Sequence, residues 1–379
     1  MHTRSSRRAL ALVAACALSV GGLAACGGGG GGNSTTSGGT SGGSSSGGGK
    51  SGTIALLLPE NKTTRYEAQD KPLFERDMKA LCPNCKIIYS NAQQDASKQQ
   101  SEAEAAITNG ARVLVLDAVD SKAAASIVTR AKQSGIGVVA YDRPVENSDV
   151  DYFVSFDNRR VGELQGRALV DRLRSDGRSG SIVMINGSPT DPNAGQFKAG
   201  AHSVIDSSGY RVAKEYDTPE WSPDQAQTEM DQAIAALGRS GFVGVYAAND
   251  GTSGGAIAAL KSAGVNPSTR PSTGQDAELA GIQRIVAGEQ YMTVYKAVKL
   301  EARAAAQLTM ELLNGRTSSS IVNTQVNNGK KNVPSVILTP VAVTVRNIRD
   351  TVVRDGYWTV NQICTSAYAA ACRSAGLTG

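Results

Sequence analysis

Polar and charged side chains follow several short apolar runs in this chain of 379 residues. The clearest cases are Asp142-Arg143 and Asn249-Asp250, which follow such runs, and Gln275-Asp276, which follows Gly274. Capping of the next helix explains any single one of these positions, because an N-cap needs only one short polar side chain. The three pairs together contain more polar and charged side chains than helix capping requires. Because ligands of open parallel sheets bind beyond the carboxyl ends of the strands, the pattern predicts a site for a polar ligand.

Catalytic and metal chemistry find little support among the residues present. Residues 251–255 read Gly-Thr-Ser-Gly-Gly and match a nucleophile elbow in form, but that fold requires a histidine after the serine. The later of the two histidines, His202, precedes Ser253. The scarcity of histidine also leaves a zinc site unsupported, and no G-x-G-x-x-G motif follows the first predicted strand. We therefore expect no enzymatic activity, no metal and no bound cofactor.

Asp142 and Asp276 are two carboxylates that could flank the scissile bond of a glycoside. However, Arg143 next to Asp142 should lower the pKa of that carboxyl group, which is wrong for a general acid. An ionised carboxylate is instead a strong hydrogen-bond acceptor for the hydroxyl groups of a sugar. Trp221 lies between two prolines, where its ring is as suited to cover the carbon face of a pyranose as to pack in the core.

The first 26 residues have the form of an export signal. Three arginines form a basic n-region, and residues 9–20 form an apolar stretch too short to span a bilayer. Residues 23–26 read Leu-Ala-Ala-Cys, which resembles the bacterial lipobox, whose cysteine accepts a diacylglyceryl group. We therefore expect Cys26 to be lipidated and to anchor an extracytoplasmic protein to the outer face of the cell membrane. An ordinary secretory signal is the alternative.

Residues 27–52 consist almost entirely of Gly, Ser, Thr and Asn and predict a flexible tether between the anchor and a folded part. The formal net charge of the whole chain is +5. Lysines and arginines are interleaved with acidic residues rather than clustered, so we expect no binding of nucleic acid.

Four of the six cysteines remain once the signal is removed and Cys26 is acylated. Four cysteines allow three pairings, and the short separations favour Cys82 with Cys85 and Cys364 with Cys372, in keeping with an oxidising location. A redox-active Cys-Pro-Asn-Cys motif is the alternative for the first pair. That motif is expected where a strand leads into a helix, whereas this pair is predicted to close a helix and lead into a strand.

From Thr53 onward, apolar runs alternate with helical patterns at a spacing of roughly 25 to 30 residues, which is typical of βαβ units and parallel sheets. Helical spacing of apolar residues follows Pro72 and recurs in residues 161–169. About ten strands are too many for one doubly wound sheet of ordinary size. The chain is also longer than one hydrophobic core usually supports. The predicted strands are residues 54–58, 86–89, 113–116, 137–140, 152–155, 182–185, 211–214, 243–247, 292–294 and 336–338.

The part of the chain from about Thr53 to the C-terminus resembles the xylose-binding class of periplasmic sugar-binding proteins of ABC transporters. These proteins have the type I periplasmic binding fold. The motifs that carry the resemblance are Val139-Ala140-Tyr141-Asp142-Arg143, Ser155-Phe156-Asp157-Asn158 with Val161-Gly162-Glu163-Leu164-Gln165, Gly187-Ser188-Pro189 with Asn193-Ala194, Asn249-Asp250 with Gly254-Gly255-Ala256, Gly274-Gln275-Asp276-Ala277 and Thr293-Val294-Tyr295-Lys296.

The resemblance implies an α/β protein of two doubly wound parallel-sheet lobes joined by a three-crossover hinge. The crossovers are expected near Phe156, Tyr295 and Pro340. The implied segments are a signal at 1–26, a linker at 27–52, an N-terminal lobe of 53–156 plus 296–339 and a C-terminal lobe of 157–295 plus 340–379.

The resemblance also implies that a monosaccharide binds between the lobes and is delivered by a monomeric protein to the permease subunits of an ABC importer. The expected ligand is D-xylose or a related aldose such as glucose, galactose or arabinose, and a sugar sensor feeding a membrane kinase or chemoreceptor is the alternative. The loop 59–68 and Pro192 depart from the xylose pattern and leave the sugar open. The implied sugar-binding residues are Arg65, Asp142, Arg143, Asn193, Trp221, Asn249, Asp276 and Lys296, with Tyr66 as a second aromatic wall.

Overall fold

The computed structural model of the protein describes residues 51–378. The predicted export signal, Cys26 and the predicted linker up to residue 50 lie outside the described residues. None of the helices in the described part is long and apolar enough to cross a membrane. Its strands form one seven-stranded, one three-stranded and one two-stranded sheet, which organise two lobes.

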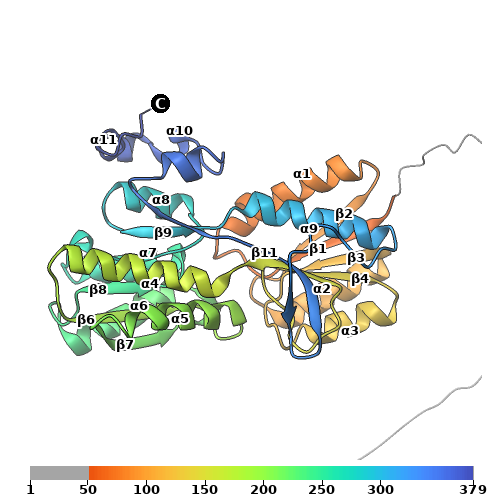
Figure 1. The fold of residues 1–379 in the computed structure, drawn as a ribbon, viewed down its shortest axis with the longest axis horizontal. Coiled ribbons are helices and arrows are strands. Elements are labelled where there is room, and N and C mark those ends of the chain that lie inside the picture. The colour runs from red at the N-terminus through yellow and green to blue at the C-terminus, as the bar shows by residue number, and fades with distance from the viewer. Residues whose placement is uncertain (1–50, 379) are drawn as a thin grey trace, which may run out of the picture. The chain divides into compact units, whose positions relative to one another are not determined.

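The N-terminal lobe is built on the seven-stranded sheet, with helices on both of its faces (Figure 1). Its strand order is β10-β11-β5-β4-β3-β1-β2, and all neighbours are parallel except the antiparallel pair of β10 and β11. The strands are β1 (Thr53–Leu58), β2 (Lys86–Asn91), β3 (Ala111–Leu116), β4 (Gly137–Tyr141), β5 (Tyr152–Phe156), β10 (Thr324–Asn327) and β11 (Asn332–Leu338). The helices are η1 (Tyr66–Asp70), α1 (Lys71–Leu81), α2 (Ala96–Thr108), α3 (Ala125–Gln133) and α9 (Val298–Leu313).

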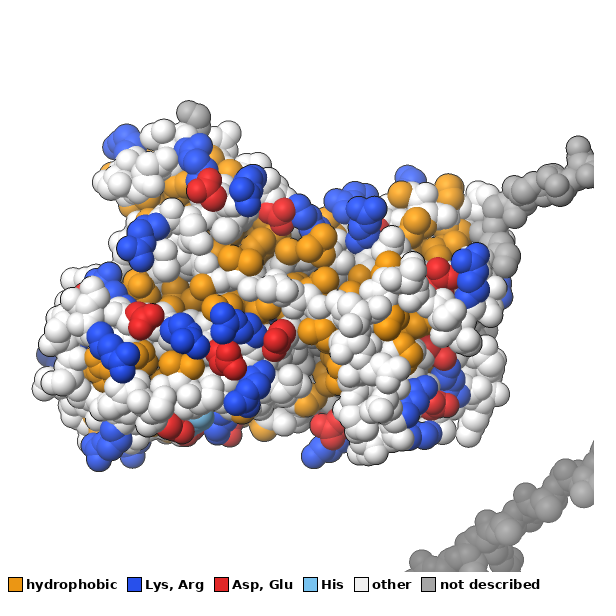
Figure 2. Space-filling model, viewed as in Figure 1, with side chains coloured by type: hydrophobic (Ala, Val, Ile, Leu, Met, Phe, Trp, Pro, Cys, Tyr) orange, Lys and Arg blue, Asp and Glu red, His pale blue; other side chains and the backbone are white. Residues whose placement is uncertain are grey.

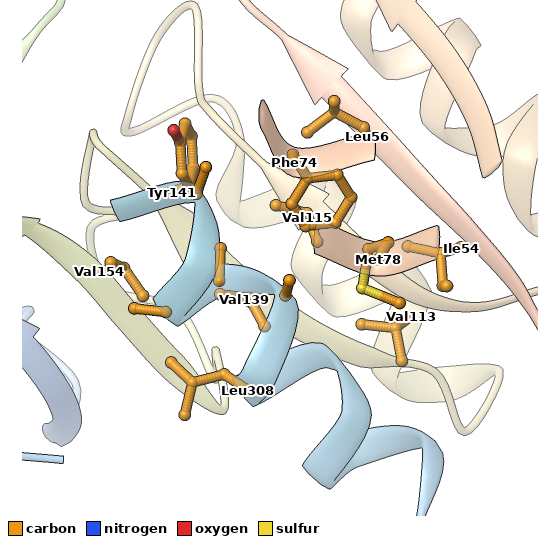
Figure 3. Close-up of a cluster of buried hydrophobic side chains, with 14 of the residues drawn as sticks. Ile54, Leu56, Phe74, Met78, Val113, Val115, Val139, Tyr141, Val154 and Leu308 are labelled. Atoms are coloured by element: carbon orange, nitrogen blue, oxygen red, sulfur yellow. The ribbon is translucent and has the colours of Figure 1, made fainter. Parts of the chain in front are cut away.

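Both faces of this sheet are buried, which is why its central strands are continuous apolar runs. In β1, Ile54 and Leu56 belong to the cluster formed with α1 and α9, whereas Ala55 and Leu57 belong to the cluster formed with α2 and α3. Successive side chains of a strand point to opposite faces, so one strand feeds both clusters. Figure 3 shows part of the first cluster, where side chains of the strands meet Phe74 and Met78 of α1 and Leu308 of α9.

The C-terminal lobe contains the three-stranded parallel sheet β7-β6-β8 and the antiparallel pair of β9 and β12. The segment 271–276 joins the two sheets, because Val245 of β8 donates to the Pro271 carbonyl and Val294 of β9 donates to the Gly274 carbonyl. The strands are β6 (Ser181–Asn186), β7 (Arg211–Asp217), β8 (Gly244–Ala247), β9 (Met292–Tyr295) and β12 (Val341–Thr344). The helices are α4 (Asn158–Ser175), α5 (Pro192–Ile205), η2 (Pro219–Trp221), α6 (Pro223–Leu237), α7 (Asp250–Ser262), η3 (Pro267–Thr269) and α8 (Leu279–Val286).

Residues 345–378, here called the C-terminal strap, follow β12 and pack on the C-terminal lobe. Ile348, Val352 and Ile363 of the strap are buried in one cluster with Ile282 and Ile285 of α8. Figure 1 shows the two α-helices of the strap beside α8. A disulfide joins Cys364 to Cys372 within the strap, and a second one joins Cys82 to Cys85 between α1 and β2. The helices of the strap are η4 (Arg349–Val353), α10 (Val360–Ile363), η5 (Ser366–Tyr368) and α11 (Ala369–Ser374).

The chain passes between the lobes three times: after β5, after β9 and after β11. These positions agree with the crossovers expected near Phe156, Tyr295 and Pro340, so the prediction of two lobes with a three-crossover hinge is confirmed. Every predicted strand is present, with ends shifted by a few residues. β10 and β12 were not predicted, and both are antiparallel partners outside the βαβ pattern.

Helices α4 and α5 pack with their backbones in close contact. A Cβ atom at Gly162 of α4 would lie 1.9 Å from the Phe197 carbonyl oxygen, and one at Gly200 of α5 would lie 2.1 Å from the Arg159 carbonyl oxygen. Neither position has room for a side chain, so both require glycine. The close approach fixes the position of α5, whose first turns carry Asn193 and Phe197.

Candidate functional site

Every side chain predicted to contact a sugar lines one cavity, to which both lobes contribute. The cavity is small and narrow, with a volume of about 20 Å³, well below the range of about 300–1,000 Å³ usual for drug-sized ligands. It lies beyond the carboxyl ends of β4, β8 and β9, where the strand pattern predicts a polar site. The lining residues are Thr63, Arg65, Tyr66, Asp142, Arg143, Asp191, Asn193, Phe197, Trp221, Asn249, Gln275, Asp276 and Lys296.

Asp142 of the N-terminal lobe and Asp276 of the C-terminal lobe share the same two cations. Arg65 Nη1 lies 3.5 Å from Asp142 Oδ2 and 3.6 Å from Asp276 Oδ1. Lys296 Nζ lies 3.6 Å from Asp142 Oδ1 and 3.1 Å from Asp276 Oδ1. The four groups form a closed ring of alternating acidic and basic side chains across the cavity, in which each acidic group contacts both cations.

The charge of Asp142 follows from this ring. Burial would raise the pKa of its carboxyl group, but Arg65, Lys296 and Arg143 outweigh burial and lower the pKa to about 2. The sequence predicts an effect of Arg143 alone, whereas Arg65 and Lys296 lower the pKa of Asp142 more than Arg143 does. Asp142 is therefore an ionised hydrogen-bond acceptor, as expected, and not a general acid.

The backbone of three cavity residues is left-handed although none is glycine: φ is 54° at Asp142, 54° at Trp221 and 86° at Asp276. Such conformations cost about 1–3 kcal/mol each and persist only where surrounding contacts hold them. At Asp142 the amide donates to the Val154 carbonyl at 2.8 Å, and the carbonyl accepts from Ser155 Oγ at 2.7 Å and Asn193 Nδ2 at 2.9 Å. The strained backbone therefore costs some stability, and it directs these three side chains into the cavity.

A chain of polar contacts connects two aromatic rings on opposite lobes. Arg143 Nη2 donates to the Tyr66 hydroxyl at 3.2 Å, and this hydroxyl donates to Asp142 Oδ2 at 3.1 Å. Arg143 Nε lies 3.1 Å from Asp191 Oδ2, which accepts from Trp221 Nε1 at 3.2 Å. Asp191 was not predicted as a site residue, and its only signal in the sequence is its place as the N-cap of α5.

Trp221 and Phe197 form the aromatic wall of the C-terminal lobe. Their ring centroids lie 6.2 Å apart at an interplanar angle of 61°. A Cβ atom at Gly187 would lie 2.0 Å from the Trp221 ring, so glycine is required where the indole crosses the backbone. Phe197 was missed in the sequence, although it lies one helical turn after Asn193 and therefore on the same helix face.

Asn249 serves as a cap and also lines the cavity. Its Oδ1 accepts from the Thr252 amide at 2.8 Å in a capping box at the start of α7. The carboxylate of Asp250 accepts from Gln290 and Thr293 outside the cavity. Of the two polar residues at this strand end, Asn249 therefore lines the cavity, whereas Asp250 makes contacts outside it.

Several buried polar atoms around the cavity have no hydrogen-bond partner among the described residues. They are Arg65 Nη1, Asp142 Oδ1, Arg143 Nε, Gln275 Oε1 and Asp276 Oδ1. Buried polar atoms are nearly always hydrogen-bonded, so this concentration of donors and acceptors marks a place for a ligand with several hydrogen-bonding groups. No group of three or more His, Cys, Asp or Glu among residues 51–378 is arranged to hold a metal ion.

Glu278 and Asp250 form a second buried acidic pair near the cavity. Glu278 Oε1 accepts from the Thr64 amide of the N-terminal lobe at 2.9 Å, and Asp250 Oδ2 accepts from the Glu278 amide at 2.9 Å. Burial, reinforced by neighbouring carboxylates, raises the pKa of Asp250 to about 7 and the pKa of Glu278 to about 8. One of the contacts between the lobes thus involves a group that titrates near neutral pH.

The free energy of unfolding is expected to fall as the pH rises from about 4.3 towards the folded pKa of Glu278. In that window the folded protein keeps a proton that the unfolded chain has lost. Glu278→Gln cannot titrate, so the wild type should lose stability relative to this variant by at most about 1.4 kcal/mol per pH unit. Denaturant unfolding at several pH values measures the difference, with the exposed Glu104→Gln as control. Parallel pH profiles of wild type and Glu278→Gln would contradict the expectation.

Comparison with known proteins finds similarity along most of the chain. The family described as "Periplasmic binding protein domain" matches residues 54–317. The D-xylose-binding periplasmic protein of Escherichia coli is 38% identical over 312 residues, which cover 81% of this chain and 91% of that protein. The multiple sugar-binding periplasmic receptor ChvE of Rhizobium radiobacter is 33% identical over 329 residues, which cover 82% of this chain and 92% of the receptor.

Among solved structures, an ABC transporter solute-binding protein from Clostridium phytofermentans with bound β-D-glucose superimposes with a TM-score of 0.74 and 28% sequence identity. The superposition covers 82% of this chain and 99% of that protein. The agreement extends over both lobes of the described part.

Proposed function

The chain belongs to the periplasmic sugar-binding proteins of ABC transporters, in the xylose-binding class, and from this premise we propose that it captures D-xylose or a closely related aldose between its lobes. It is a binding protein and not an enzyme, as the family is. Delivery of the sugar to the permease subunits of an ABC importer, by a monomeric receptor, completes the proposed role.

The observation that carries the proposal is the set of buried donor and acceptor atoms around the cavity that have ion-pair contacts at most and no hydrogen-bond partner among the described residues. A sugar hydroxyl both donates and accepts, so it can bridge an ionised carboxylate and a neighbouring cation. Flat aromatic rings from both lobes can cover the carbon face of a pyranose. An uncharged polyhydroxy ligand therefore fits a wall whose two carboxylates are already paired by Arg65 and Lys296.

The proposed sugar contacts are the side chains named from the resemblance, together with Phe197 and Gln275. Because the sugar touches both lobes, its binding energy favours the closed arrangement, which a transporter can read. The proposed lobe boundaries are 53–156 plus 296–339 and 157–295 plus 340–379. The division of strands between the sheets supports them.

Attachment to the membrane is also part of the proposal. The Leu-Ala-Ala-Cys sequence at residues 23–26 supports lipidation of Cys26, and the Gly- and Ser-rich residues that follow support a tether. The receptor would then stay at the outer face of the cell membrane, close to its importer.

A thermal-shift screen tests the ligand class. Sugar at about 1,000 times its Kd stabilises a one-site protein by about 4 kcal/mol, so D-xylose should raise Tm by several degrees. D-glucose, D-galactose and L-arabinose are compared in the same screen, and glycerol at equal concentration controls for general stabilisation by a polyol. If no aldose shifts Tm while a nucleotide or an amino acid does, the proposed function is wrong.

A further inference from the structure

Asp276 and Ala277 form a turn that is left-handed at two consecutive residues, with φ values of 86° and 50°. Their amide groups are held by β9, because Asp276 donates to the Val294 carbonyl at 2.8 Å and Ala277 donates to Thr293 Oγ1 at 3.2 Å. Consecutive left-handed residues that are not glycine need support on every side. The two amide contacts hold only the side of the turn that faces β9.

The carbonyl groups of the same turn are held by the C-terminal strap. The Tyr357 hydroxyl donates to the Asp276 carbonyl at 3.1 Å, and Trp358 Nε1 donates to the Ala277 carbonyl at 2.8 Å. Neither aromatic residue lines the cavity. Any effect of these two side chains on a bound ligand is therefore indirect.

The two donors are themselves fixed in place. The Tyr357 ring packs edge-on against Tyr295 at 5.1 Å and against Trp358 at 5.4 Å between centroids. These aromatic rings belong to the buried cluster that joins the strap to α8. Further along the strap, a disulfide joins Cys364 to Cys372. The position of α10 and α11 beside α8 is visible in Figure 1.

The strap also contacts the opposite lobe. Gln69 Nε2 of η1 donates to the Tyr357 carbonyl at 3.1 Å. Helix η1 directly follows Arg65, which lies 3.6 Å from the Asp276 carboxylate. Tyr357 thus connects the segment that carries Arg65 with the turn that carries Asp276.

We propose that Tyr357 and Trp358 are positioning residues: by holding the carbonyls of the Asp276–Ala277 turn, they keep the Asp276 carboxylate aimed into the cavity and so set the affinity for the sugar. This inference rests on the proposed function, in which Asp276 binds the sugar. At Asp142 the corresponding carbonyl is held by Ser155 and by Asn193 of the cavity wall. At Asp276 the same task falls to a segment outside the cavity.

The test is a double-mutant cycle on D-xylose binding, measured by calorimetry and, for weak variants, by thermal shift at high sugar concentration. Tyr357→Phe keeps the ring and removes the hydroxyl that donates to the Asp276 backbone carbonyl, and it should weaken binding about tenfold, the net size of one ordinary hydrogen bond. In the Asp276→Asn background, Tyr357→Phe should change the remaining affinity less than about twofold, because coupled residues do not act additively. Trp358→Phe should show the same pattern.

Tyr295→Phe is the matched control. It removes a hydroxyl from the same aromatic cluster, but that hydroxyl donates to Asp355 and not to the turn, so affinity should stay within about twofold. The inference is overturned if Tyr357→Phe binds like wild type, if its loss is equally large in the Asp276→Asn background, or if Tyr295→Phe loses as much. Wild-type affinity in Asp276→Asn alone would instead overturn the sugar site itself.

Discussion

Arg65→Met is expected to lower the free energy of unfolding by about 3–5 kcal/mol and to abolish sugar binding, because it removes a buried cation from among four carboxyl groups. Arg65 donates to both oxygens of Asp70 and to Glu301 Oε2, besides its ion pairs with Asp142 and Asp276. Its side chain is only 1% exposed, so water cannot replace these partners. Denaturant unfolding and calorimetry measure the two losses.

The pH dependence of this variant distinguishes lost charge pairing from lost packing. In the wild type, the folded pKa of Asp142 is about 2, below the value of about 3.9 in an unfolded chain. Its contribution to stability is therefore present above about pH 4 and is lost as the pH falls towards 2. Without Arg65 the folded pKa should rise, so the deficit of Arg65→Met should be largest at neutral pH and smaller at about pH 4.

Two further variants complete this experiment. Arg65→Lys keeps the charge but not the planar fork, and its stability should fall between wild type and Arg65→Met. Arg76→Met removes a 60%-exposed arginine that pairs with Asp77 and should cost less than about 0.5 kcal/mol. A loss below about 1 kcal/mol in Arg65→Met would show that the ring of charges contributes little.

Asp276→Asn should weaken the binding of D-xylose by about 30- to 1,000-fold, or about 2–4 kcal/mol, while the protein stays folded. The substitution is nearly isosteric, so it changes charge more than shape. It removes the negative charge beside Lys296 Nζ, which lies 3.1 Å from Asp276 Oδ1, and leaves both buried cations with one counter-charge fewer. Titration calorimetry gives the affinity, and Tm without sugar reports the fold.

Asp151→Asn is the matched control for this prediction. Asp151 is a partly buried carboxylate that pairs with Lys132 and directly precedes β5, and its side chain is 21% exposed and does not line the cavity. Its substitution should leave the affinity within about twofold. Tight sugar binding by Asp276→Asn would mean that the carboxylate faces no sugar hydroxyl.

The sheets were predictable where burial on both faces leaves a continuous apolar run, as in β1 and β3, whose residues are almost all buried. Strands β10 and β12 were missed for the opposite reason. β10 is a largely exposed edge strand of Thr, Gln, Val and Asn, and β12 has one fully buried residue, Val343, among its four. The pairing of these two strands depends on residues distant in the sequence, so no local sequence pattern predicts it.

The polar wall of the cavity was predictable because parallel strands deliver their carboxyl ends to one place. The buried residues that pair with this wall from behind were not predictable. Arg65 contacts Asp70, five positions away, and Glu301, which is separated from it by 236 positions. Glu301 lies in α9, whose apolar stripe gives no reason to expect a buried carboxylate. One residue can both cap a helix and line the cavity, since Asn249 caps α7 and is part of the cavity wall.

The ring of alternating charge has a consequence for a receptor that works outside the cell. Asp142 stays ionised far into the acid range, and carboxylates on both sides raise the pKa of Lys296. Neither group exchanges a proton when the surroundings drift between mildly acidic and mildly alkaline, and ions in the medium screen them little because both are buried. The charges of Asp142 and Lys296 in the cavity therefore stay the same when the pH of the habitat changes within this range.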